Sequence, residues 1–233
     1  MTEVDEAPEV GRQSLQILYR DEALVVIMKP PGAVIHRTRG VPRDTLILPR
    51  VLGDELGLRV FPVHRLDRPT SGVLVFALSS AMASAMAGDI QSQQWKKRYV
   101  GLARGPIADA IRVDYPVPEG DKRREARTDF DPVETFSGRY TLLRAYPQTG
   151  RYHQVRRHLR HLRHPLVGDT NYGDGKVNRF FRETLGLRRL FLHAERLEFP
   201  HPAESRRLCI DAPLAPDLAT VLEALRRHTG PVA

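Results

Sequence analysis

The sequence predicts a single α+β domain in which a mixed or mostly antiparallel sheet is flanked by helices. Apolar runs of strand length, such as residues 73–78 (VLVFAL), recur between short polar turns. Segments with apolar residues at helical spacing lie between them. No internal repeat, heptad run or low-complexity linker divides the 233 residues, so one domain is expected at residues 14–229, after a flexible tail at residues 1–13.

The first part of the chain is expected to form a strand pair, a helix and a buried strand. Residues 15–29 predict two short strands joined by an Asp-Glu turn, and the prolines that follow end the second strand because proline lacks a ladder donor. A helix is expected at residues 44–57, where the apolar residues lie close to one face. Residues 60–66 are expected to be extended, and residues 67–72 form a turn before the buried strand at 73–78.

The second part predicts further strands and three helices. Ser79 or Ser80 is a candidate N-cap for a helix that runs to about Gln94, and a strand follows at residues 96–105. The remaining strands are expected at residues 111–115, 126–136, 140–146, 190–199 and 206–211. The remaining helices are expected at residues 151–163 and 216–228.

The charge of the chain indicates a polyanionic partner. Thirty-six Lys and Arg residues against 28 Asp and Glu give a formal net charge of +8. Residues 151–164 (RYHQVRRHLRHLRH) hold five arginines, four histidines and no acidic residue. A solvated helix face usually alternates charges of both signs, so this self-repelling segment favours an external anion such as an RNA backbone.

Composition also excludes several classes of protein. The single cysteine, Cys209, rules out an internal disulfide and any multi-cysteine metal site. No apolar run approaches the roughly 20 residues that a membrane helix needs. The amino terminus is acidic, whereas a signal peptide begins with basic and then apolar residues, so we expect a cytoplasmic protein without a membrane segment.

The segment with the clearest chemical content is residues 64–72, HRLDRPTSG. An aspartate in such a turn usually caps the turn through bonds from backbone amides to its side chain. Asp67 also has an arginine on each side, and these keep a carboxylate ionised, as a nucleophile requires. Residues alone leave both interpretations open.

Residues 64–72 resemble the signature of the RluA-type pseudouridine synthases. Five further segments resemble motifs of that family, namely residues 29–32 (KPPG), 97–99 (KRY), 149–156 (TGRYHQVR), 164–169 (HPLVGD) and 190–194 (LFLHA). Six ordered motifs over about residues 18–213 exceed coincidence. The resemblance implies a pseudouridine-synthase-like catalytic domain, an isomerase that converts uridine to pseudouridine in structured RNA by base flipping, with no cofactor and no metal.

The resemblance also implies roles for individual residues. Asp67 is the expected nucleophile, Tyr99 stacks on the flipped uracil, and Arg156 pairs with Asp67. Leu192 is expected in the pocket wall. Contacts to RNA are expected from Arg65, Arg151, Arg160, Arg163 and Lys29. Arg65 resembles the arginine that fills the gap left in the RNA stack, with a phosphate contact as the alternative. For Arg160 and Arg163 the phosphate contact is expected from their charge, and plain surface charge is the alternative.

The expected helix at 151–163 explains how Arg156 reaches the site. Val155, Leu159 and Leu162 form one stripe that packs on the sheet, and Arg156, Arg160 and Arg163 form the neighbouring stripe. Arg156 therefore borders the core, where we expect a bidentate ion pair with Asp67. The role of Arg157 stays undecided.

Other interpretations remain as alternatives. His158, His161 and His164 recur at every third position, but the segment adds no carboxylate and its arginines repel a cation, so no metal is expected. Closer details, including the run RRHLRHLRHP, most resemble the branch of this family that modifies uridine 65 of tRNA, near the junction of the acceptor and T stems. We expect the protein to be a monomer. The alternatives are a ribosomal-RNA synthase of the same type and an RNA-binding protein without catalysis. A carboxylate hydrolase is disfavoured because residues 64–72 supply no second acid.

Overall fold

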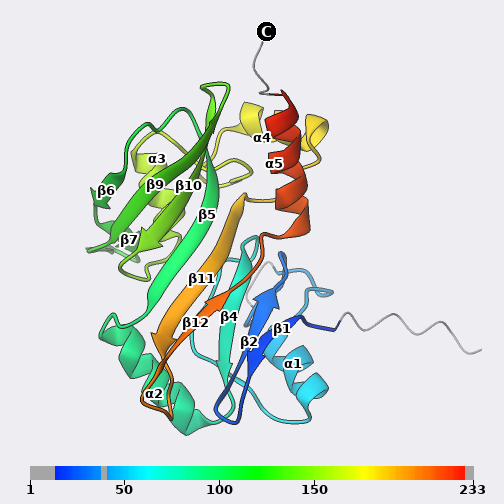
Figure 1. Ribbon diagram of the computed structural model, residues 1–233, viewed down its shortest axis with the longest axis vertical. Helices are drawn as coiled ribbons and strands as arrows, with labels where there is room; N and C mark the ends of the chain where they lie inside the picture. The colour runs from blue at the N-terminus through cyan, green and yellow to red at the C-terminus, as the bar shows by residue number, and fades with distance from the viewer. Residues whose placement is uncertain (1–13, 38–40, 229–233) are drawn as a thin grey trace, which may run out of the picture.

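The computed structural model describes residues 14–37 and 41–228, which fold around one large sheet (Figure 1). Its strands are β1 (Ile17–Arg20), β2 (Leu24–Lys29), β3 (Phe61–Pro62), β4 (Ser71–Ala77), β5 (Lys96–Arg104), β6 (Ile111–Asp114), β9 (Arg127–Phe136), β10 (Tyr140–Pro147), β11 (Leu192–Pro200) and β12 (Arg207–Asp211). A separate hairpin consists of β7 (Val117–Glu119) and β8 (Lys122–Arg124).

The sheet is mixed and mostly antiparallel. Its strands follow the order β1, β2, β4, β11, β5, β10, β9 and β6, with β12 paired to β11 and β3 paired to β4. Neighbours are antiparallel except for β4 and β11, which run parallel. The predicted α+β class and sheet type are therefore confirmed.

Helices cover both faces of this sheet. They are α1 (Leu48–Leu56), α2 (Ser80–Gln91), α3 (Gln154–His161), α4 (Gly175–Thr184) and α5 (Pro216–His228). Side chains alternate along a strand, so Leu74 and Phe76 of β4 join the core cluster under α1, whereas Val73 and Val75 join the cluster with α2. The cluster under α3 shares Tyr99 with the α1 cluster, and the cluster under α4 and α5 shares Met28 with the α2 cluster. The helices α1 and α3 thus lie on one face.

The predicted elements are present, with three main differences. The helix expected at residues 151–163 is shorter, because His153 (φ 56°) and Arg163 (φ 64°) have left-handed backbones that end it on both sides. The helix α4 was not predicted. Its contacts with the core come from Val177, Phe181 and Leu185 at every fourth position, and the side chain of Asp174 caps its first turn. The charged β7–β8 hairpin was also missed.

Two predictions fall outside the described residues. They are the tail at residues 1–13 and the final residue of the expected domain, residue 229. Within the described part of the chain, no helix has both the length and the apolar character needed to cross a membrane.

Candidate active site

The candidate site lies on the sheet face that α1 and α3 cover, between their two hydrophobic clusters. Tyr99 of β5 contacts both clusters. Asp67 comes from the loop between β3 and β4, and Arg156 comes from α3. Three segments far apart in the sequence therefore meet where neither helix covers the sheet.

Gly72 brings the Asp67 loop close to the sheet centre. It has φ +118°, and a Cβ atom there would lie 2.2 Å from the carbonyl oxygen of Ala194. Gly72 pairs with Ala194 where β4 begins to run beside β11. Only glycine permits this approach, so the loop must end in a glycine to place Asp67 beside the residues of β11 and β5.

Lys29 also holds the Asp67 loop in place, through hydrogen bonds to backbone carbonyl groups. Its side chain is fully buried, and Nζ donates to the carbonyl oxygens of Pro30 (2.9 Å), Arg68 (3.1 Å) and Thr70 (2.8 Å). Burial and the nearby Arg189 lower the pKa of Lys29 to about 7, whereas three carbonyl acceptors favour its ammonium form. The predicted contact of Lys29 with RNA is wrong, because its donors are already used and no surface reaches solvent.

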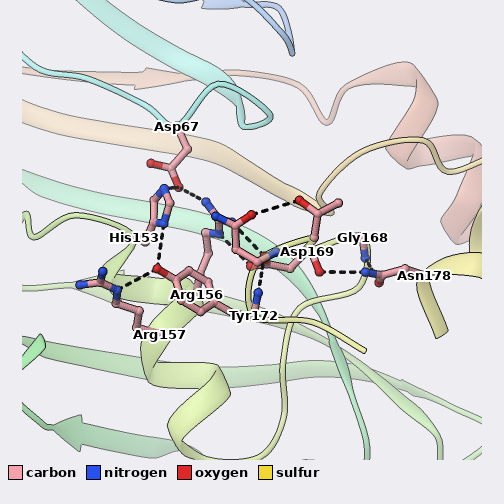
Figure 2. A network of polar contacts seen from close by, with 10 residues as sticks. Asp67, His153, Arg156, Arg157, Gly168, Asp169, Tyr172 and Asn178 are labelled. Carbon is pink, nitrogen blue, oxygen red and sulfur yellow. Dashed lines mark hydrogen bonds and ion pairs between the residues drawn. The ribbon is translucent and has the colours of Figure 1, made fainter. Parts of the chain in front are cut away.

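Arg156 joins two carboxylates (Figure 2). Its Nη1 donates to Oδ2 of Asp67 at 3.0 Å, while Nε and Nη2 donate to Oδ2 and Oδ1 of Asp169 at 2.7 and 2.8 Å. The pairing of Arg156 with Asp67 was predicted, but the bidentate geometry was assigned to the wrong acid. Asp169 receives the two-pronged contact because it is fully buried beside the guanidinium, whereas the Asp67 side chain is 17% exposed and faces the cavity.

Asp169 is the main site residue that the sequence did not reveal. Gly168, with φ +77°, approaches Arg189 so closely that a Cβ would lie 2.0 Å from its carbonyl oxygen. Oδ1 of Asp169 also accepts from the amides of Asn171 (2.9 Å) and Tyr172 (3.0 Å). Burial alone would raise the pKa of Asp169, but these bonds and Arg156 hold it below its ordinary value. The motif HPLVGD contains Asp169, but no sequence pattern indicated that Arg156 is its partner.

The orientation of α3 depends on Gln154, its first residue. Its Oε1 accepts from the hydroxyl of Thr149 (2.6 Å) and the amide of Arg151 (3.0 Å). Its Nε2 donates to the carbonyl of Arg127 and the hydroxyl of Thr128, both at 2.9 Å. This buried amide fixes the turn before the helix, and with it the direction in which the arginine two residues later points.

A cavity of about 360 Å³ opens beside the Asp67 carboxylate. Tyr99, Leu192, Lys97 and Arg156 are among the residues that line it. Burial, and to a smaller extent the charge of Asp67, raise the pKa of Tyr99, so its ring stays a neutral phenol. The structure thus brings together the three residues expected to bind and transform a base and the expected pocket wall. They are Asp67, Tyr99, Arg156 and Leu192.

A larger cleft of about 1220 Å³ adjoins this cavity and shares Asp67 and Arg65 with it. Arg68, Arg188 and Arg189 add to its positive lining. Of the arginines expected to contact RNA, Arg65 lines both spaces and Arg151 lines the small one.

Arg160 and Arg163 are exposed but line neither space. Arg163 also falls outside the helical stripe expected with Arg156 and Arg160, because α3 ends at His161. Their contact with RNA stays a prediction.

The histidines of the basic segment contact neighbouring groups of the protein. His158 contacts the hydroxyl of Thr128 and the carbonyl of Tyr115, both at 2.9 Å, and His164 contacts the carbonyl of Arg104. His161 stacks on Tyr115. The three rings therefore serve the packing of α3, and the expectation that they bind no metal stays a prediction.

Elsewhere in the described chain, Asp21, His201 and Glu204 come close enough to share an ion. Nδ1 of His201 accepts from the amide of Ala203 (3.2 Å), so Nε2 carries the hydrogen and donates it to Asp21 at 2.8 Å. The guanidinium of Arg206 donates a hydrogen bond to the carboxylate of Glu204. A nitrogen that carries a hydrogen offers no lone pair to a metal, so hydrogen bonds account for this cluster.

Comparison with known proteins decides the family. The family model described as RNA pseudouridylate synthase matches residues 23–161. A protein of Vibrio cholerae called tRNA pseudouridine synthase C is 43% identical over 222 residues, covering 86% of this chain and 91% of that protein. The chain belongs to the RNA pseudouridylate synthase family. It is accordingly an isomerase that converts uridine to pseudouridine in RNA.

Other members of the pseudouridylate synthase family agree in sequence and in fold. The protein of the same name from Haemophilus influenzae is 39% identical, covering 86% of this chain and 93% of that protein. The solved structure of human RNA pseudouridylate synthase domain containing 4 superposes with a TM-score of 0.75 at 26% identity, covering 91% of this chain and 93% of that one. For human RNA pseudouridylate synthase domain containing 1 the TM-score is 0.73 at 25% identity, with coverages of 97% and 100%. The predicted resemblance to this family is confirmed.

Proposed function

We propose that this pseudouridylate synthase modifies tRNA at uridine 65, near the junction of the acceptor and T stems, with Asp67 as the nucleophile. The observation that carries the proposal is the Asp67 carboxylate, fixed by Arg156 at 3.0 Å on the edge of the cavity of about 360 Å³ that Tyr99 and Leu192 line. The choice of tRNA rests on the relatives called tRNA pseudouridine synthase C. A tRNA substrate implies a cytoplasmic enzyme, and we propose that it acts as a monomer.

The uracil must leave its helical stack to reach Asp67. Flipping costs a few kcal/mol, and stacking on the Tyr99 ring returns about 1–3 kcal/mol. Arg65 and Arg151 line the cavity, and we expect Arg151 to contact the RNA and Arg65 to contact a phosphate or fill the gap in the stack. Both donors near Asp67 approach Oδ2, since Arg156 bonds it at 3.0 Å and His153 Nε2 lies 3.7 Å from it. This leaves Oδ1 to act on the ribose or the base.

The reaction breaks the N1–C1′ bond, turns the base and forms a C5–C1′ bond, and a proton leaves C5 while N1 gains one. Addition of Asp67 to C1′ and removal of a ribose proton both agree with this geometry. Asp169 does not act as a second acid, because Arg156 and two backbone amides bind its ionised carboxylate. This argues against the hydrolase alternative, since a general acid must hold a proton.

Tritium release tests the function. The purified enzyme is incubated with tRNA transcripts containing uridine tritiated at C5, and with ribosomal RNA fragments in parallel. Release from the tRNA, but not from a transcript with cytidine at position 65, is the expected result. Release only from ribosomal RNA would favour the alternative of a ribosomal-RNA synthase. No release from any RNA would favour an RNA-binding protein without catalysis.

A further inference from the structure

His153 lies beside Asp67 in an unusual backbone conformation. It precedes α3 with φ 56° and ψ 27°, in the left-handed region that non-glycine residues seldom adopt. This conformation places its ring between Asp67 and Tyr172 (Figure 2). Such strain persists where the surroundings impose it, and it often marks a functional position.

The direction of the hydrogen bonds around His153 follows from one residue that only donates. Arg157 Nε donates to the hydroxyl oxygen of Tyr172 at 2.9 Å, since a guanidinium has no acceptor. The hydroxyl keeps its own hydrogen to donate, and Nδ1 of His153 lies 3.1 Å away. Because the ionised Asp67 carboxylate beside Nε2 can only accept, the tautomer that suits both neighbours has Nδ1 as the acceptor and the hydrogen on Nε2. That N–H faces Oδ2 of Asp67 at 3.7 Å.

The environment keeps this ring neutral. Burial lowers the pKa of His153 to about 4, Asp67 and Asp169 act in the opposite direction, and Arg156 and Arg157 lower it further. Near pH 7 the ring therefore presents an N–H dipole rather than a positive charge. The exposed Tyr152 stacks on its other side, with ring centroids 3.7 Å apart.

We propose that His153 is a positioning residue for the nucleophile, held as the Nε2–H tautomer by a relay from Arg157 through the Tyr172 hydroxyl. The inference rests on the proposed role of Asp67 in the isomerisation. Arg156 and His153 approach the same carboxylate oxygen from two directions and so restrict its rotation. The other oxygen then stays directed at the cavity. A closure of less than 1 Å on RNA binding would turn the contact with His153 into a hydrogen bond.

Removing the hydroxyl of Tyr172 gives the most specific test, because this group does not contact Asp67. Tyr172→Phe keeps the ring that packs against the Arg156 guanidinium, 5.1 Å from it, and removes the hydroxyl that contacts His153 and accepts from Arg157. We expect kcat to fall about fivefold to tenfold, the effect of one hydrogen bond, with KM for tRNA unchanged. Tyr140→Phe is the matched control, since Tyr140 packs on Phe181 in another cluster, and it should keep wild-type kcat.

A double-mutant cycle separates positioning from packing. His153→Leu removes the N–H, and His153→Gln supplies an amide N–H in its place, so Gln should retain more kcat than Leu. Adding Tyr172→Phe to His153→Leu should cause no further loss, because no imidazole remains to be oriented. Independent losses from the two changes, or equal activity of the Leu and Gln variants, would overturn the proposal.

The tautomer itself is observable without turnover. In protein labelled with ¹⁵N-histidine, the ring signals of His153, assigned by their loss in His153→Gln, should show a protonated Nε2 and a bare Nδ1 at pH 7. Tyr172→Phe should shift this ring toward the mixture of tautomers seen in free histidine. A protonated Nδ1 in the wild type would refute the relay, whether or not the proposed tRNA substrate is correct. If the wild type modified tRNA while Tyr172→Phe kept full kcat, only this inference would fail.

Discussion

Replacing Asp169 by asparagine tests whether the buried Arg156–Asp169 pair supports both the fold and the site. Asparagine has the same shape but no charge, and its amide group must replace one oxygen. If its oxygen keeps the backbone amides of Asn171 and Tyr172, its NH₂ group faces the Nε–H of Arg156. One charge-assisted hydrogen bond is then lost and a donor is left without an acceptor.

The magnitude follows from burial. The Asp169 side chain is 0% exposed and that of Arg156 is 5% exposed. Removing one partner of such a pair costs about 3–5 kcal/mol. Arg156 keeps its contact with Asp67, so we expect the lower end, about 3 kcal/mol. For a chain of this length that corresponds to a fall in Tm of about 6–12 °C. The activity should fall at least tenfold, because Arg156 loses the contact that aims it.

Thermal unfolding of the purified variant measures this effect, and Asp211→Asn is the matched control. Asp211 also forms a bidentate pair, with Arg196, but the two side chains are 49% and 40% exposed. Exposed pairs contribute about 0–1 kcal/mol, so the control should unfold close to the wild type. If the two variants lost the same small amount of stability, burial would not explain how much the Arg156–Asp169 pair contributes to stability. The reasoning would then be refuted.

Three further predictions address chemistry, pH and RNA affinity. Asp67→Asn should abolish tritium release while RNA affinity stays within several-fold, and residual turnover above a few per cent would exclude it as the nucleophile. His64 accepts from the amide of Val75, and burial lowers its pKa to about 3. Because the unfolded chain binds this proton below about pH 6.5, stability should fall by about 2 kcal/mol from pH 7 to pH 5, and urea unfolding of His64→Gln should show a smaller fall. Neutralising Arg160 and Arg163 should flatten the slope of log affinity against log salt by roughly 1–2 units, and an unchanged slope would make them ordinary surface charges.

Much of the fold could be predicted because its signals are local. The run at residues 73–78 was expected to be a buried strand, and it forms most of β4 at the centre of the sheet. The serine cap of α2 was visible too, and Ser79 does accept from the amide of Met82 at 3.2 Å. The helix α4 was missed although it has local signals, since Val177, Phe181 and Leu185 recur at helical spacing and Asp174 caps its first turn.

The site residues also divide into those that a local motif indicates and those that it does not. Asp67, Tyr99 and Arg156 stand in motifs, so their roles could be expected before any distance was known. The partners of Arg156 could not, because helical spacing predicts the direction of a side chain but not which acid lies there. Asp169 is 13 positions further along the chain and Asp67 is 89 positions before it. A buried arginine between two acids gives its bidentate contact to the one that solvent cannot reach, and this leaves the other acid held by a single N–H. That asymmetry gives one carboxylate a structural task and keeps the other available for substrate, and it arises from burial rather than from any feature of the motifs.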